Sequence, residues 1–291
     1  MKRRDFLSIG ASATLLSACA SLTPKDTPPP PPQPPAPVIA LALGGGASRG
    51  FVHIGVIKAL ETHKIVPDLI VGTSAGSVVG ALYASGLSAF NLQEVAHKMD
   101  ERTFQDWSLS DRGFLKGDAI ETFVNREIKN QAFETLKRRF AAVATDLSTG
   151  EAKIFNSGNV GQAVRASCAV PGVFSPVSIA GREYVDGGLS SPVPVNAARQ
   201  LGANYIIAVD ISARPSGKIG GNTLSILLDT VAIMGNTIGT YELKSANAVI
   251  RPKIEKLSAT NFTQRNEAIL EGERAGFAAI NDILKQLGRQ A

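Results

Sequence analysis

The stretch LIVGTSAGSVVGALYA, residues 69–84, decides the fold. Its first three residues form a short apolar run, GTSAG (72–76) follows at once, and small and apolar residues continue to Ala84. This order predicts a buried strand, a sharp turn and a helix, which is the context in which Gly-x-Ser-x-Gly exposes a reactive serine. The helix dipole favours negative charge at that point. Ser74 is therefore the candidate nucleophile.

Gly72 and Gly76 flank Ser74 on either side. A side chain at either position would clash in so tight a turn, so both glycines are interpreted as parts of a nucleophile elbow. The alternative is a chance glycine loop, which the strand and helix around it disfavour.

A second glycine turn lies upstream. The apolar run 38–43 predicts a strand, GGGASRG (44–50) follows, and residues 51–63 have a helical apolar pattern. As a dinucleotide loop the pattern is weak because Arg49 occupies the position of the last glycine, and the Gly-Lys-Ser/Thr of a phosphate loop is absent. The third alternative is an oxyanion hole made of free N–H groups, which the downstream serine favours.

The base that would take the serine proton is less obvious. His53 lies within the first predicted helix, and neither His63 nor His97 lies in a late loop after a strand. We interpret His53 as packed and the other two as solvated. Asp186 ends an apolar strand before two glycines, and a buried carboxylate can act as a base. The residues alone favour an ordinary turn aspartate, for which Asp-Gly is common.

Together these motifs resemble the patatin-like phospholipase family, and most closely its bacterial branch related to neuropathy target esterase. The resemblance covers roughly residues 40–209. It rests on the loop 44–50, the elbow 72–76, DGG (186–188), ATDLSTG (144–150) and the stretch RASCAVPGVF (165–174).

The resemblance implies a three-layer α/β/α domain with a central, mainly parallel sheet. It also implies a serine acyl-ester hydrolase that acts on lipids through a dyad of Ser74 and Asp186. The oxyanion hole would be drawn from Gly44, Gly45 and Gly46, with the last two favoured. Arg49 either steers an anionic headgroup or pairs with a carboxylate. The alternatives are an acyltransferase with the same serine and an inactive lipid-binding surface lipoprotein.

The N-terminus has the pattern of an export signal. Residues 1–19 combine a basic start containing Arg3-Arg4, a short apolar run and Leu-Ser-Ala-Cys, which resembles a lipobox with Cys19 as the lipidated residue. The proline-rich residues 20–37 predict an extended linker, and the domain is expected over 38–291. We therefore expect a twin-arginine-type signal and a lipid anchor in a bacterial cell envelope, with the outer membrane preferred.

Other partners are not expected. The net charge is +5, but no basic run with interleaved aromatic residues predicts nucleic-acid binding. No cluster with metal-ligand spacing is present, so neither metal nor cofactor is expected. The segment 94–139 is interpreted equally as a cap beside the site or as an ordinary helical insert. The apolar segment 224–238 is predicted as a core helix in preference to a membrane or dimer face. The sequence indicates no oligomeric state.

Overall fold

The computed structural model describes residues 36–99, 106, 114–212, 221 and 223–289. The predicted signal segment 1–19, with Cys19, and nearly all of the predicted linker lie outside these residues. Residues 37–291 form one compact unit.

Eight described strands form one sheet with the order β5-β6-β3-β2-β1-β7-β8, and β4 pairs with β3. The strands are β1 (Ile39–Leu43), β2 (Leu69–Thr73), β3 (Arg139–Asp146), β4 (Ala152–Phe155), β5 (Val177–Ile179), β6 (Arg182–Asp186), β7 (Tyr205–Val209) and β8 (Ala248–Ile250). Pairing is parallel from β3 through β2, β1 and β7 to β8, and antiparallel where β3 meets β4 and β6 and where β5 meets β6.

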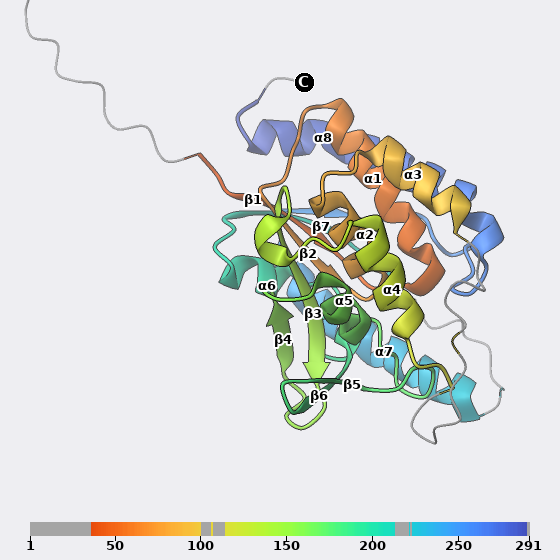
Figure 1. Cartoon of the computed structure of the whole chain (residues 1–291). Coiled ribbons are helices and arrows are strands. Elements are labelled where there is room, and N and C mark those ends of the chain that lie inside the picture. The colour runs from red at the N-terminus through yellow and green to blue at the C-terminus, as the bar shows by residue number, and fades with distance from the viewer. Residues whose placement is uncertain (1–35, 100–105, 107–113, 213–220, 222, 290–291) are drawn as a thin grey trace, which may run out of the picture. The chain divides into compact units, whose positions relative to one another are not determined.

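Helices cover the sheet on both faces (Figure 1). They are α1 (Phe51–Thr62), α2 (Ala75–Ala84), α3 (Ala89–Lys98), α4 (Asp118–Glu127), α5 (Val160–Ser167), α6 (Val195–Gln200), α7 (Thr223–Leu243) and α8 (Arg265–Gln286). The predicted strands and helices around Ser74 and the glycine loop are confirmed, with bounds that differ by no more than a few residues. The mostly parallel sheet between helical layers also confirms the predicted fold class.

Alternating side chains along the central strands build two separate cores. In β1, Leu41 and Leu43 face a large apolar cluster shared with helices α1 to α5 and α8. Ala40 and Ala42 face the other side, where a smaller cluster includes residues of α6 and Leu243 of α7. This period-two alternation follows from strand geometry, and burial on both faces explains why the strands are apolar throughout.

The first and last helices of the domain pack backbone to backbone. A Cβ at Gly55 would lie 1.9 Å from the Ile269 carbonyl oxygen, and one at Gly272 would lie 2.0 Å from the Val52 oxygen. Only glycine allows so close an approach. The helix α8 therefore holds α1, which in turn follows the glycine loop.

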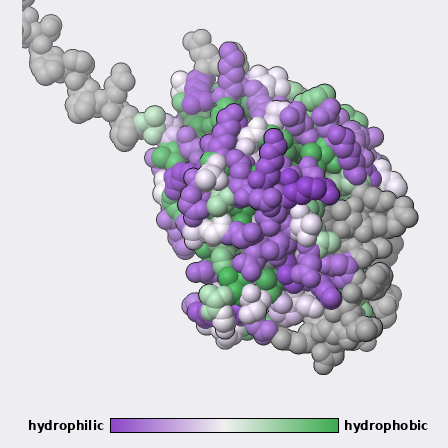
Figure 2. Space-filling model, viewed as in Figure 1, coloured by the Kyte–Doolittle hydropathy of each residue, from purple (hydrophilic) through white to green (hydrophobic). Residues whose placement is uncertain are grey.

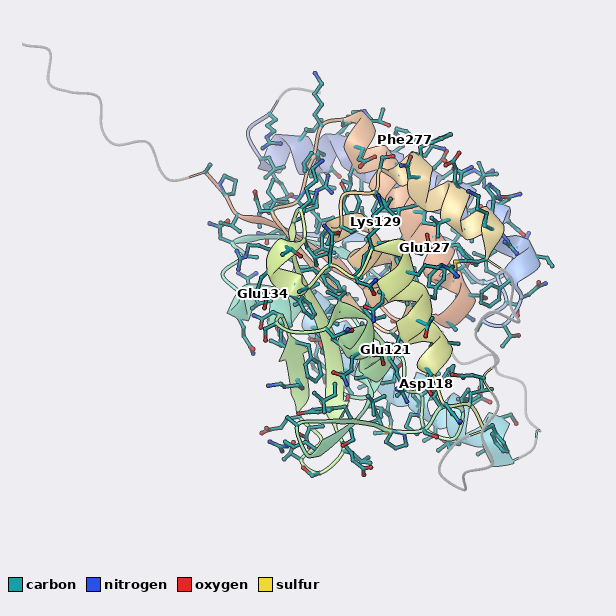
Figure 3. The ribbon with its side chains drawn as sticks, in the orientation of Figure 1. Asp118, Glu121, Glu127, Lys129, Glu134 and Phe277 are labelled. Atoms are coloured by element: carbon teal, nitrogen blue, oxygen red, sulfur yellow. The ribbon has the colours of Figure 1, made fainter. Side chains whose placement is uncertain are left out.

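A charged cluster joins α4 to α5. Arg165 of α5 lies 2.5 Å from a carboxylate oxygen of Asp118 and 3.4 Å from one of Glu121. Both carboxylates project from α4 (Figure 3). Because α5 ends at Ser167, this cluster helps to fix a turn that contacts the candidate site.

Candidate active site

Two strands of opposite direction end against each other beside β3. The parallel strand β2 pairs with residues 139–143 of β3, and the antiparallel strand β6 pairs with residues 144–146. Since β4 pairs with residues 142–145 on the other side, β2 and β6 share one side of β3. Thr73 lies opposite Val143 and Asp186 lies opposite Ala144. This register brings Ser74, the residue after β2, to the end of β6.

Ser74 has a backbone conformation that is unusual for a residue with a side chain. Its φ is 51° and its ψ is −124°, between the end of β2 and the start of α2. The main chain is held on both sides, because the Ser74 N–H donates to Ser167 Oγ at 2.9 Å and the Ser74 carbonyl accepts from the Ser77 N–H at 2.8 Å. The surrounding structure thus fixes a strained turn.

The glycines around Ser74 are required by close contacts. A Cβ at Gly72 would lie 2.4 Å from the Gly76 oxygen, and one at Gly76 would lie 2.2 Å from the Leu43 oxygen. A Cβ at Gly45 would come within 3.2 Å of the Ser74 Cβ. The glycine loop therefore lies directly against the candidate nucleophile.

Asp186 is almost completely buried, and its backbone is anchored. Its N–H donates to the Ala169 oxygen at 2.9 Å, its carbonyl accepts from the Thr145 hydroxyl at 2.9 Å, and its Oδ1 accepts from the Gly188 N–H at 2.7 Å. Within the described part of the chain, the buried Oδ2 atom has no hydrogen-bond partner. Burial raises the pKa of Asp186 from 3.8 to about 6, against the opposing effects of the Ser74 hydroxyl and the Gly188 N–H.

Two of the three predicted oxyanion N–H groups already have acceptors. Gly44 donates to the Val209 oxygen at 3.0 Å, and Gly45 donates to the Pro192 oxygen at 3.0 Å. The N–H groups of Gly46 and Ala47 make no hydrogen bond to any described residue. Of the predicted set Gly44, Gly45 and Gly46, in which the last two are favoured, only Gly46 thus has an N–H without a described acceptor, and the neighbouring Ala47 N–H is in the same state.

Ala47 itself has a left-handed backbone with φ 52°. Because a Cβ is strained there, we expect Ala47→Gly to raise the free energy of unfolding by about 1 kcal/mol. Urea denaturation measures the change. The control is Ala278→Gly, at an exposed position of the right-handed helix α8, which should lower stability by about 1 kcal/mol. A loss at both sites would contradict the assigned strain.

An apolar cavity of about 370 Å³ opens on the candidate nucleophile. Ser74, Ala75 and Ala47 line it together with Met99, which follows α3, and with side chains of α1, α2 and α3, among them Ile54, Val78, Leu82, Leu92 and Val95. The described parts of the predicted cap, including Leu115 and Ile120, also line this cavity. Residues 100–105 and 107–113 of that segment lie outside the described residues.

None of the three histidines is among the described lining of the cavity. His53 is fully buried, and its Nε2 lies 2.8 Å from the Gly44 oxygen. Since a carbonyl only accepts, Nε2 carries the proton, and burial lowers the pKa of His53 to about 4. His53 is thus a neutral core residue that holds the glycine loop. His97 is exposed, while the His63 side chain contacts its own helix at the Ala59 oxygen.

Arg49 is not among the described residues that line the cavity. Its Nε donates to the Leu257 oxygen at 3.1 Å, and it pairs with no carboxylate among the described residues. Burial lowers the pKa of this guanidinium. The predicted ion pair is therefore not seen among the described residues, and Arg49 instead links the glycine loop to residue 257. Its Nη1 is buried without a hydrogen-bond partner in the described part of the chain, and headgroup steering stays a prediction.

Two supporting residues were not identified from sequence. The Ser167 hydroxyl accepts from the Ser74 N–H and donates to the Val143 oxygen at 2.5 Å. Thr145 donates to the Asp186 oxygen and contacts Ser190 Oγ at 2.8 Å. Both residues lie within family-like motifs, so the motifs marked the right segments without showing which side chain mattered.

Known proteins are similar to this chain in sequence. An uncharacterized NTE family protein of Mycobacterium tuberculosis is 38% identical over 185 residues, which are 62% of this chain and 50% of the relative. Lysophospholipase NTE1 of Scheffersomyces stipitis is 33% identical over 181 residues, 60% of this chain and 12% of that protein. The chain thus spans half or less of the length of these relatives.

The fold is also similar to a solved structure. The crystal structure of VipD from Legionella pneumophila gives a TM-score of 0.61 at 13% identity, over 87% of this chain and 67% of that one. The pattern of the patatin-like phospholipase family matches residues 41–199, a span that contains the glycine loop, Ser74 and Asp186. The chain therefore belongs to the patatin-like phospholipase family.

Proposed function

We propose that this protein hydrolyses acyl esters of lipids, with Ser74 as nucleophile and Asp186 as base. The observation that carries the proposal is an apolar cavity opening on a strained serine beside a buried carboxylate with one free oxygen. Apolar lining with few polar groups is typical of a site that binds a hydrocarbon segment. The name of the yeast relative, a lysophospholipase, supports the same class of substrate.

The size of the cavity suits a fatty acyl chain. A dry cavity of about 150 Å³ accommodates a six-carbon ring, so about 370 Å³ suits an acyl segment on the order of 15 carbon atoms. We therefore propose phospholipids and lysophospholipids with long acyl chains as substrates, with the ester carbonyl at Ser74.

The chemistry proceeds through an acyl-enzyme. Ser74 Oγ attacks the ester carbonyl carbon while its proton passes to Asp186, and the N–H groups of Gly46 and Ala47 stabilise the resulting oxyanion. The intermediate collapses, and the leaving alcohol takes the proton from Asp186. Water then attacks the acyl-serine, gives a proton to Asp186, and releases the fatty acid while Ser74 regains its hydrogen. Burial supports the role of Asp186 because it makes the carboxylate a stronger base.

Covalent labelling and product analysis test this proposal together. A fluorophosphonate probe should label Ser74, located by peptide mass spectrometry, and free fatty acid should be released from phosphatidylcholine or lysophosphatidylcholine vesicles. Triolein emulsions serve as a neutral comparison, which should be cleaved more slowly if the polar headgroup contributes to binding.

Either of two results would indicate a different function. Transfer of the acyl group to an added alcohol in preference to water would indicate an acyltransferase. Absence of both labelling and product would indicate a lipid-binding protein without activity. Ser77→Ala is a matched control for labelling, because Ser77 is fully buried three residues further along and should not react.

The location of the protein stays a proposal as well. The N-terminal motifs support export through a twin-arginine-type signal and lipid attachment at Cys19, in a bacterial envelope. Metabolic labelling with an alkyne fatty acid should mark the wild-type protein and not Cys19→Ser; equal labelling of both would remove the assignment.

A further inference from the structure

The helix α7 exposes an apolar face, contrary to its prediction as a core helix. Six of the twelve exposed large apolar side chains among the described residues lie on α7, with exposed fractions from 36% to 66%. They are Ile226, Leu227, Leu228, Ile233, Met234 and Tyr241. The apolar residues of this segment face outward. Its hydropathy pattern does not distinguish an exposed apolar helix from a buried one. We call this set the α7 face.

Threonines on the same helix add to its apolar character. The hydroxyls of Thr230, Thr237 and Thr240 donate to the carbonyls four residues earlier, at 2.8, 3.2 and 2.8 Å. Their hydrogen-bonding needs are met without water, so these side chains can enter an apolar phase at little cost. Between residues 225 and 241 the only charged residue is Asp229.

The far end of the helix resembles a membrane-interface anchor. The Lys244 ammonium lies 4.7 Å from the centre of the Tyr241 ring. Aromatic and lysine side chains have apolar bodies and polar tips, which suit the boundary between lipid and water. By contrast, the face shown in Figure 2, over α3, α4 and α5, is mainly hydrophilic.

The helix also contacts the segment that carries the site. A Cβ at Gly235 would lie 3.4 Å from the Gly188 oxygen, two residues beyond Asp186. The buried Glu242 carboxylate accepts from the Ser191 hydroxyl at 2.7 Å and from the Val193 N–H at 3.3 Å. Pro192, between these two residues, accepts from the Gly45 N–H. The inner side of α7 therefore packs against the segment that follows Asp186 and that accepts from the glycine loop.

We propose that the α7 face lies on a lipid bilayer surface and brings the Ser74 site next to its lipids. The inference rests on the proposed lipid substrate and adds the surface on which that substrate is met. No helix in the described part of the chain is long and apolar enough to cross a membrane. An apolar face along one side of a helix instead suits a helix lying in the interface. A second copy fits less well, since a stable dimer buries about 800 Å² per partner and this face follows a single helix.

Vesicle binding tests the proposal. Full-length protein carrying Cys19→Ser, which removes the predicted lipid attachment, is sedimented with phosphatidylcholine–phosphatidylglycerol vesicles. Ile233→Gln with Met234→Gln should weaken binding about tenfold, because two half-exposed apolar side chains no longer enter the bilayer. Phe90→Gln with Leu270→Gln is the matched control, an equally exposed apolar pair on α3 and α8, and should leave binding unchanged.

Activity measurements separate a loss of vesicle binding from a loss of catalysis. Hydrolysis of a short soluble p-nitrophenyl ester should stay at the wild-type rate in the α7 variant, while hydrolysis of vesicle lipid falls about tenfold with binding. Ser74→Ala should bind vesicles normally, so a failure of the proposed activity does not affect this test. Three outcomes would each overturn the proposal. The α7 pair and the control pair could lose vesicle binding equally, or the parent protein could fail to bind vesicles. The α7 variant could also change only its oligomeric state, as measured by ultracentrifugation. If the first variant unfolds, Ile226→Gln with Tyr241→Gln tests the same face.

Discussion

Replacing Ser74 by glycine is expected to abolish ester hydrolysis and to make the protein more stable. Loss of a catalytic serine lowers kcat by a factor on the order of 10⁴ or more, because the remaining groups cannot form an acyl-enzyme. Stability should rise by about 1–2 kcal/mol, because φ 51° at this position strains a residue with a Cβ and suits glycine. Initial rates on a p-nitrophenyl ester and thermal unfolding give the two values.

Ser74→Ala is the informative control for that experiment. It removes the hydroxyl but keeps the Cβ, so it should lose activity to the same extent without the gain in stability. If glycine and alanine variants had equal stability, the elbow would store no strain. If either variant kept wild-type turnover, Ser74 would not be the nucleophile.

Asp186→Asn should lower kcat/KM by a factor on the order of 10³ or more, because the amide cannot accept the serine proton. In the parent protein, kcat/KM should fall as the pH drops below about 6, since the carboxylate must be ionised to act as a base. A pH profile measured on a soluble ester shows this limb, which the asparagine variant should lack. A parent profile that stays flat from pH 8 to pH 4 would contradict the role of Asp186.

Asp186→Asn should also change stability: the variant that loses activity should gain free energy of unfolding. The folded protein holds the pKa of Asp186 near 6 against an ordinary 3.8, so ionisation opposes folding by about 3 kcal/mol above pH 6. Asp186→Asn should therefore be more stable than the parent at pH 8 by up to about 3 kcal/mol. This difference should shrink as the pH falls through 6 and vanish below about 4, where both states bind the proton. Urea unfolding at three pH values measures it.

The sequence was sufficient to predict the parts of the fold that depend on local pattern. The apolar runs before Ser74 and before the glycine loop predict buried strands, and a serine between two glycines in that context predicts a tight turn. These features follow from spacing along the chain. They place the helices α1 and α2 and the strands β1 and β2 correctly.

What depends on contacts between distant segments could not be predicted. Whether Gly44 and Gly45 keep free N–H groups is decided by Val209 and Pro192, far along the chain, whose carbonyls accept from them. Arg49 was interpreted from its charge, but its Nε donates to a carbonyl of residue 257, more than two hundred residues along the chain. The apolar segment of α7 gives the same hydropathy pattern whether it is buried or exposed.

The meeting of β2 and β6 beside β3 has a consequence for the newly made chain. A chain that has paired only β1, β2 and β3 holds one half of the proposed reactive pair, because Asp186 belongs to β6, which begins at Arg182, beyond the end of β3 at Asp146. Partly folded molecules in which β6 is not yet paired with β3 should therefore have no hydrolase activity. On the proposed mechanism, hydrolysis can therefore begin only once β6 has paired with β3.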